Sequence, residues 1–137
     1  MFSNPKDSEL IELLKNSKNI AVVGLSPKPE RPSHYVAEYL QRQGYKIIPV
    51  NPGHKMLLGE KSYPDLKSIP GRIDVVDVFR NPAKVLPIVE EAIEIGGGTI
   101  WFQEGIINEQ AADIALKNGL KVIMDRCMLK EHMRLIG

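Results

Sequence analysis

The sequence alternates short apolar runs with segments whose apolar residues recur at helical spacing. Five of the apolar runs lack an alternation of polar and apolar positions, which is typical of strands covered on both faces. These runs are residues 19–24, 45–50, 73–79, 99–102 and 120–124. Strands of this kind, separated by helical segments, predict a parallel sheet with helices on both sides.

Four segments with helical periodicity lie around these runs. The first begins at Asp7 or Ser8 and ends near Asn16, so that residues 1–17 form a helical flap. The others cover residues 33–43, 82–95 and 108–118, and each is followed by glycine. Residues 64–68 predict one short helical turn. We therefore expect one α/β domain over residues 1–137, a Rossmann-like three-layer fold with a five-stranded parallel sheet in the order 3-2-1-4-5.

The composition indicates which classes of partner and which cellular compartment to expect. Eighteen basic residues against seventeen acidic ones leave a net charge of +1, without a basic run, so nucleic acid is not an expected partner. No segment has the apolar length of a signal peptide or a membrane span, which predicts a cytoplasmic protein without a membrane partner. One cysteine excludes an intramolecular disulfide and fits a reducing compartment.

The residues that follow the predicted strands are the candidates for binding. Ligands of parallel sheets bind beyond the carboxyl ends of the strands, where the strand order reverses. Unusual residues follow all five strands: Gly24-Leu25-Ser26, Asn51-Pro52-Gly53-His54-Lys55, Arg80-Asn81-Pro82, Gln103-Glu104-Gly105 and Asp125-Arg126-Cys127. We therefore predict a site along the carboxyl edge, although helix capping is the better explanation of Asn81 and of Asn108.

The loop after the first run has the residues of an anion site. Gly24 permits close approach of a ligand to the backbone, while Arg31 and Ser33 offer a guanidinium and a hydroxyl to phosphate oxygens. The dinucleotide fingerprint G-x-G-x-x-G is absent. A purely structural turn, with Ser33 as helix N-cap and Arg31 as a solvated charge, explains the same residues.

The loop after the second strand lacks the acidic residue that holds ribose hydroxyls in NAD-binding domains. His54 and Lys55 stand there instead and suit a ribose phosphate, or they are ordinary exposed loop residues.

Catalytic residues are sparse. The three histidines, His34, His54 and His132, lack the spacing of metal ligands, and no metal site is predicted. Cys127 is either a reactive thiol, with a pKa lowered by Arg126, or a buried packing residue.

Several motifs together resemble a known family. They are Val23-Gly24-Leu25-Ser26, Arg31-Pro32-Ser33, Pro49-Val50-Asn51-Pro52, Asp77-Val78-Phe79-Arg80, Trp101-Phe102-Gln103-Glu104-Gly105 and Asp125-Arg126-Cys127. Over residues 18–134 the chain resembles the small stand-alone CoA-binding proteins, which are similar to the N-terminal CoA-binding domain of the succinyl-CoA synthetase alpha subunit.

The resemblance implies a role for each loop. The pyrophosphate of CoA would lie on Gly24, Leu25 and Ser26 with Arg31 and Ser33. Asn51 and Pro52, with the adjoining His54 and Lys55, would take the adenosine 3′-phosphate end. Phe79, Arg80 and Asn81 would flank the adenine or pantetheine, and Gln103, Glu104 and Gly105 would lie near the thiol arm.

We expect a non-catalytic CoA or acyl-CoA binding protein that acts as a carrier, a sensor or a partner subunit, with a protein partner or a second copy of the chain. The phosphohistidine of the ligases belongs to a second domain, and no such domain is expected here. An NAD(P)-linked oxidoreductase on the same fold and an interaction protein with a vestigial nucleotide site are the alternatives. If Cys127 faces the pocket, we expect a mixed disulfide with CoA under oxidising conditions.

Overall fold

The computed structural model describes residues 2–137. Its centre is a parallel sheet of β1 (Asn19–Val23), β2 (Lys46–Val50), β5 (Val75–Val78), β6 (Thr99–Phe102) and β7 (Lys121–Ile123). A separate two-stranded antiparallel hairpin is formed by β3 (Met56–Leu57) and β4 (Glu60–Lys61). The α/β class and the five parallel strands are confirmed.

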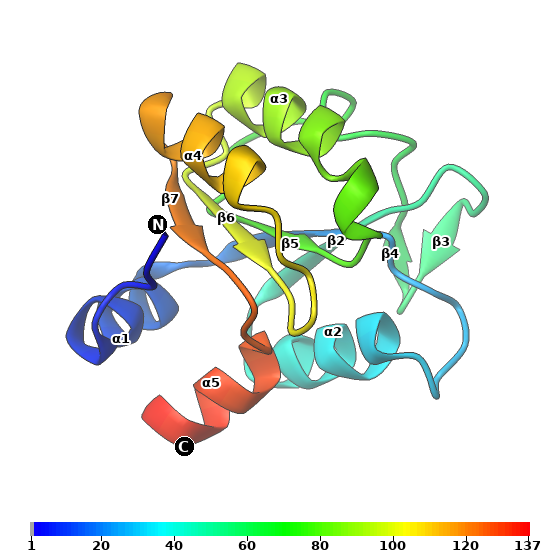
Figure 1. The fold of residues 1–137 in the computed structure, drawn as a ribbon. Coiled ribbons are helices and arrows are strands. Elements are labelled where there is room, and N and C mark those ends of the chain that lie inside the picture. The colour runs from blue at the N-terminus through cyan, green and yellow to red at the C-terminus, as the bar shows by residue number, and fades with distance from the viewer. Residues whose placement is uncertain (1) are drawn as a thin grey trace.

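Helices cover both faces of this sheet (Figure 1). On one face lie α3 (Leu86–Ile95) and α4 (Glu109–Lys117), and on the other lie α1 (Asp7–Asn16), α2 (Pro32–Arg42) and α5 (Met128–Leu135). A short 3-10 helix, η1 (Pro82–Lys84), precedes α3. Within residues 2–137, no helix combines the length and the apolar character that a membrane crossing requires.

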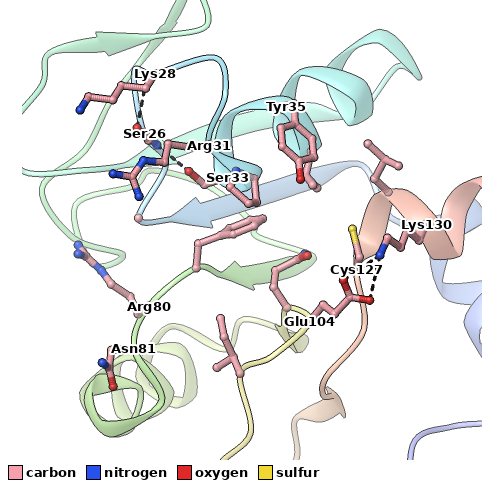
Figure 2. Close-up of a pocket in the computed structure, with 17 residues that line it drawn as sticks. Ser26, Lys28, Arg31, Ser33, Tyr35, Arg80, Asn81, Glu104, Cys127 and Lys130 are labelled. Carbon is pink, nitrogen blue, oxygen red and sulfur yellow. Dashed lines mark hydrogen bonds and ion pairs between the residues drawn. The ribbon is translucent and has the colours of Figure 1, made fainter.

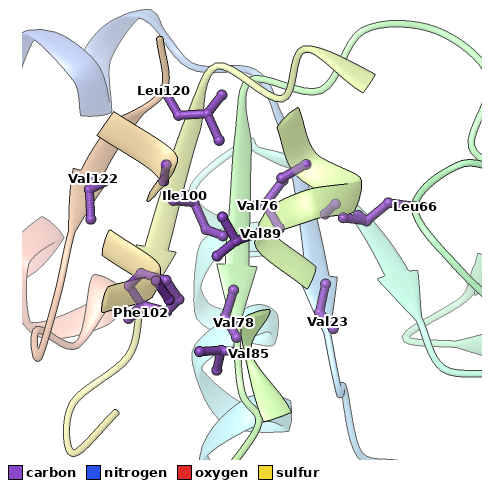
Figure 3. Close-up of a cluster of buried hydrophobic side chains, with 14 of the residues drawn as sticks. Val23, Leu66, Val76, Val78, Val85, Val89, Ile100, Phe102, Leu120 and Val122 are labelled. Atoms are coloured by element: carbon purple, nitrogen blue, oxygen red, sulfur yellow. The ribbon is translucent and has the colours of Figure 1, made fainter. Parts of the chain in front are cut away.

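Two apolar layers hold the helices to the sheet. Alternate residues of each strand point to opposite faces, so that Val76 and Val78 of β5 pack under α3 and α4 (Figure 3). Val75 of the same strand packs with Trp101 and Met128 under α2 and α5. Asp77 follows this alternation and therefore belongs to the α2 and α5 face, where it is completely buried.

The structure differs from the predicted strand order in the place of one strand. Counted along the chain, the five parallel strands lie in the order 2-1-3-4-5, because β5 pairs with β1 and not with β2. The outer edge of β2 is instead bridged by Tyr63, which follows the β3–β4 hairpin. After Tyr63, Leu66 and Ile69 pack against the face of the sheet that α3 and α4 cover. The chain then forms β5 beside β1. The order therefore reverses between β1 and β5.

Most predicted helices are present with shifted ends. The helix predicted over 33–43 is α2, the segment 82–95 is divided into η1 and α3, and Asn108 caps α4 as expected by accepting from Ala111 N. The predicted helical turn at 64–68 is a bend followed by one hydrogen-bonded turn, in which Ile69 N–H donates to the Leu66 carbonyl, and it contains no helix. Helix α5 was not predicted, and it is the helix that closes one end of the site.

Candidate functional site

A pocket of about 600 Å³ lies at the carboxyl edge of the sheet, at the reversal between β1 and β5 (Figure 2). This is the position where doubly wound sheets bind their ligands, and the volume is in the range of small-molecule sites. Ten of the residues singled out from the sequence line it: Gly24, Ser26, Arg31, Ser33, Phe79, Arg80, Asn81, Gln103, Glu104 and Cys127.

Gly24 is the junction that brings two of these loops together. Its φ is +88°, and a Cβ at this position would lie 2.4 Å from the carbonyl oxygen of Phe79. Any side chain would therefore both strain the backbone and push the loop after β1 away from the end of β5. The glycine serves the contact between two strand ends, in addition to the ligand approach expected from the sequence.

The loop from Ser26 to Ser33 is held in shape by its own hydrogen bonds. The Ser33 hydroxyl accepts from the Ser26 backbone N–H at 2.9 Å, and the Ser26 hydroxyl accepts from the Lys28 N–H at 3.1 Å. His34 Nδ1 donates to the Ser26 carbonyl at 2.9 Å. Ser33 is thus not the N-cap of α2, since Arg31 has that position and Pro32 is the first helical residue. Its hydroxyl proton remains available to a ligand oxygen.

One end of the pocket is strongly cationic. Lys28 and Arg31 project from the loop before α2, and Arg80 projects from the end of β5 on the other side of Gly24 (Figure 2). None of the ion pairs formed within residues 2–137 involves these three side chains. The N-terminus of α2 faces the same space and adds the positive end of its dipole. An anion with several charges fits this end.

The opposite end is closed by α5 and by the loop after β6. Glu104 of that loop accepts from Lys130 Nζ at 2.8 Å, which ties the loop to α5 (Figure 2). Gly105 N–H donates to Asp125 Oδ1 at 2.8 Å, so the loops after β6 and β7 are also joined. The charges at this end neutralise each other, in contrast to the three cations at the other.

Cys127 lies at this second end and is 9% exposed. It precedes the first residue of α5, and the backbone N–H groups of Leu129 and Lys130 interact with its sulfur. Burial nevertheless raises the pKa of the thiol, and the Asp77 and Glu104 carboxylates raise it further. Of the two alternatives for Cys127, a pKa lowered by Arg126 is wrong, because this guanidinium lies 3.6 Å from Glu131 and donates to the Asp125 carbonyl.

Beneath the pocket, Asp77 forms a buried hydrogen bond with Gln103. Gln103 Nε2 donates to Asp77 Oδ1, and Asp77 Oδ2 is buried without a partner among the residues described. Burial raises the pKa of Asp77 to about 7, while the bond from Gln103 acts in the opposite direction. This carboxyl is therefore poised between its protonated and ionised forms at neutral pH.

Six of the residues proposed from the sequence do not line the pocket: Leu25, Asn51, Pro52, His54, Lys55 and Gly105. Leu25 is completely buried in the layer under α2. The Asn51 side chain is engaged by the Leu25 carbonyl at 2.9 Å and the Gly53 N–H at 2.8 Å. His54 and Lys55 are exposed before the β3–β4 hairpin. Their assignment to a phosphate of the ligand stays a prediction.

Seven pocket residues were not among the predicted site residues: Lys28, Pro32, Tyr35, Val36, Ile106, Leu129 and Lys130. The buried acid Asp77 was not among them either. Lys28 belongs to the same loop as Arg31 and was open to the same argument. Leu129 and Lys130 were missed with α5, although the apolar residues at positions 129, 133 and 136 have helical spacing. The side chain of Asp77 interrupts an apolar run, which is the signal that was available for it.

Comparison with known proteins identifies the family of this fold and site. Residues 18–133 match the model of the CoA binding domain, and the chain belongs to that family. The chain is 44% identical over 131 residues to the uncharacterised protein YneT of Bacillus subtilis strain 168, which covers 96% of this chain and 97% of that protein. A hypothetical protein from Pyrococcus horikoshii OT3 shares the fold with a TM-score of 0.95 and 41% identity, over 100% of this chain and 99% of the other.

The same domain occurs inside larger enzymes. The alpha subunit of the ADP-forming acetate–CoA ligase II of Pyrococcus furiosus is 27% identical over 130 residues, which are 87% of this chain and 28% of that subunit. The chain therefore spans a little over a quarter of this ligase subunit. The resemblance to ligase CoA-binding domains noted in the sequence is confirmed.

Proposed function

We propose that this chain binds coenzyme A or an acyl-CoA and catalyses no reaction on it. The observation that carries the proposal is the group of three cations, Lys28, Arg31 and Arg80, around the Gly24 loop without an acidic partner within residues 2–137. CoA has a pyrophosphate and a 3′-phosphate, and guanidinium groups bind such oxygens in pairs. Membership of the CoA binding domain family supports the same ligand.

In this proposal the ligand extends across the pocket. The pyrophosphate lies on Gly24 and Ser26 with Arg31 and Ser33, and the adenine or pantetheine lies beside Phe79, Arg80 and Asn81. The pantetheine arm then runs toward Gln103 and Glu104, so that its thiol comes near Cys127. This direction places the polyanion at the cationic end and the neutral arm at the end where Glu104 and Lys130 are paired.

A binding role is favoured over a catalytic one by the state of the titratable groups in the pocket. Glu104 is engaged by Lys130, and the pKa of the Cys127 thiol is raised by burial, which keeps the sulfur protonated. His54 and Lys55 are the predicted ligands for the ribose phosphate of either CoA or NADP, so affinity measurements must separate these two ligands.

Calorimetric titration of ligand-free protein with CoA, dephospho-CoA, NAD and NADP tests the proposal. CoA is expected to bind most tightly, and dephospho-CoA more weakly because it lacks the 3′-phosphate. Tighter binding of NAD or NADP than of CoA would overturn the proposal in favour of an oxidoreductase.

The roles of carrier, sensor and partner subunit differ in assembly. The molecular mass in solution, measured by light scattering with and without CoA, separates them in part. A change of mass on CoA binding supports a sensor or a subunit, whereas a constant mass with tight binding supports a carrier.

A further inference from the structure

Asp77 is a buried acid whose hydrogen bonding is incomplete. It is 0% exposed, its Oδ1 accepts from Gln103 Nε2, and its Oδ2 has no partner among the described residues. A buried carboxylate with an unpaired oxygen is costly, because neither water nor a donor compensates the charge. Taking up a proton removes the charge at once.

Gln103 connects this acid to the ligand space. It is 4% exposed, lines the pocket, and lies directly after β6, beside the β5 strand that carries Asp77. A side-chain amide has an accepting oxygen on one side and a donating amino group on the other. Whichever of the two is bonded to Asp77, the other is left for a ligand.

The surroundings of Asp77 contain few charges that could control its proton. Its neighbours across the sheet are Val22 of β1 and Trp101 of β6. The helices packed on this face carry the following titratable or charged side chains: Asp7, Glu9, Glu12 and Lys15 of α1, His34, Tyr35, Glu38, Tyr39 and Arg42 of α2, and the capping Cys127 with Lys130, Glu131, His132 and Arg134 of α5. Of these, the thiol of Cys127 is the one whose pKa is raised by the Asp77 carboxylate. Glu104 and Lys130 stand at the pocket mouth and neutralise each other.

We propose that the proton on Asp77 decides which side of the Gln103 amide faces the pocket, and that the site thereby distinguishes free CoA from its acyl thioesters. When Asp77 is ionised, the Gln103 amino group donates to it, and the amide oxygen is left to accept the S–H of free CoA. When Asp77 is protonated, its O–H donates to the Gln103 oxygen, and the amino group is left to donate to a thioester carbonyl. The inference rests on the proposed function. It adds that Gln103 and Asp77 distinguish the thiol of free CoA from the carbonyl of a thioester.

The direction of the pH dependence follows. Because the pKa of Asp77 is raised to about 7, the protonated form prevails in mild acid and the ionised form in mild base. Acyl-CoA is then favoured below neutral pH and free CoA above it. By linkage, acyl-CoA binding takes up protons near neutral pH and CoA binding releases them.

The two ligands allow a clean measurement, since they carry the same phosphates. Titration of those phosphates and of the cationic end cancels in the ratio of the two dissociation constants. The affinities of CoA and acetyl-CoA are measured by calorimetry at about pH 5.5 and about pH 8.5, in two buffers of different ionisation enthalpy to count protons. We expect the preference for CoA to increase about five- to tenfold between these values, the size of one neutral hydrogen bond.

Two variants assign the effect to Asp77 and Gln103. Asp77→Asn removes the titration and keeps the shape, and Gln103→Met keeps the volume of the side chain without its amide. Both are expected to bind the two ligands with a ratio that no longer changes with pH. Asp113→Asn, on the exposed side of α4 and outside the pocket, is the control that retains the change.

The outcomes separate this inference from the proposed function. A constant ratio in the parent protein, with both ligands bound, overturns the inference and leaves CoA binding intact. Binding of neither ligand at any pH refutes the proposed function itself. If Asp77→Asn fails to fold, two measurements still test the inference. The parent should take up protons on binding acetyl-CoA and release them on binding CoA, and Gln103→Met should have a ratio of dissociation constants that does not change with pH.

Discussion

The two ends of the pocket differ in how they handle charge. At the Gly24 end, Lys28, Arg31 and Arg80 are exposed and lack ion pairs within the described chain. At the α5 end, the one carboxyl that is fully buried, Asp77, holds no counter-charge, and the exposed Glu104 is neutralised by Lys130. In the proposed function, the exposed cations supply affinity for a polyanion, and the proton on Asp77 supplies discrimination between CoA and its thioesters. The predictions below test that division.

The largest effect is expected from Gly24→Ala, which disrupts the contact between the loop after β1 and the residues that follow β5. Its Cβ would lie 2.4 Å from the Phe79 carbonyl oxygen at a φ of +88°, so the clash and the backbone strain add. We expect the free energy of unfolding to fall by roughly 3–5 kcal/mol and CoA binding to be lost. Denaturant unfolding and calorimetry measure both.

Gly119→Ala is the matched control for this change. Gly119 has a similar φ of +86°, but a Cβ there would meet nothing within 4 Å. It should therefore show only the cost of the left-handed backbone, about 1 kcal/mol, and bind CoA normally. Equal losses of stability in both variants would refute the close contact between Gly24 and Phe79.

Asp77→Asn is expected to make the protein more stable at high pH. The folded pKa of Asp77 is about 7, above its ordinary value of 3.8, so ionisation opposes folding. The penalty is absent below the unfolded pKa, accumulates as the pH rises between the two values, and is complete above the folded one. The variant should gain roughly 2–4 kcal/mol over the parent at about pH 8.5 and little at about pH 4.

The measurement is the difference in unfolding free energy between variant and parent along this pH range. Taking the difference removes the contribution of the other carboxyls, which titrate in both proteins. A difference that does not grow with pH would show that Asp77 is ionised without penalty in the folded protein.

Arg31 tests the cationic end alone. Arg31→Ala should weaken CoA binding by about 1.5–3 kcal/mol, and Arg31→Lys by less, because lysine keeps the charge and loses the guanidinium fork. The pH dependence of the ratio between CoA and acetyl-CoA should be unchanged in both. Lys55→Ala, in the loop that does not line the pocket, provides the comparison. A loss at Lys55 equal to that at Arg31 would show that the ligand extends over the loop after β2.

The sequence predicted the parts of this molecule that local chemistry determines. Buried strands appear as apolar runs, and Asn108 is a cap recognisable by its type, so the class and most elements were found. The place of β5 was not determined by its own residues, because it depends on Tyr63 occupying the edge of β2. A contact between distant segments leaves no periodic signal in either segment.

The same distinction holds for the site. Gly24, Arg31 and Arg80 were predicted because the residues that follow parallel strands share one edge of the sheet. Asn51 satisfies the same rule, yet its amide holds the Leu25 carbonyl and the Gly53 N–H, so position at the edge did not make it a pocket residue. Of the two alternatives for Cys127, the buried residue agrees with the structure and the lowered pKa does not, since sequence adjacency to Arg126 said nothing of the Glu131 carboxylate that holds this guanidinium.

Cys127 gives the smallest and slowest expected effect. If the CoA arm runs toward α5, treatment with CoA disulfide should convert Cys127 into a mixed disulfide: its thiolate attacks one sulfur and releases the other half as CoA thiolate. Because burial raises the pKa of this thiol, the reaction should be slow at neutral pH and accelerate as the pH rises. Intact mass spectrometry should show an adduct of CoA size that reductant removes and that Cys127→Ser lacks. An unmodified protein under conditions that saturate the CoA site would refute the mixed disulfide and leave Cys127 as a packing residue.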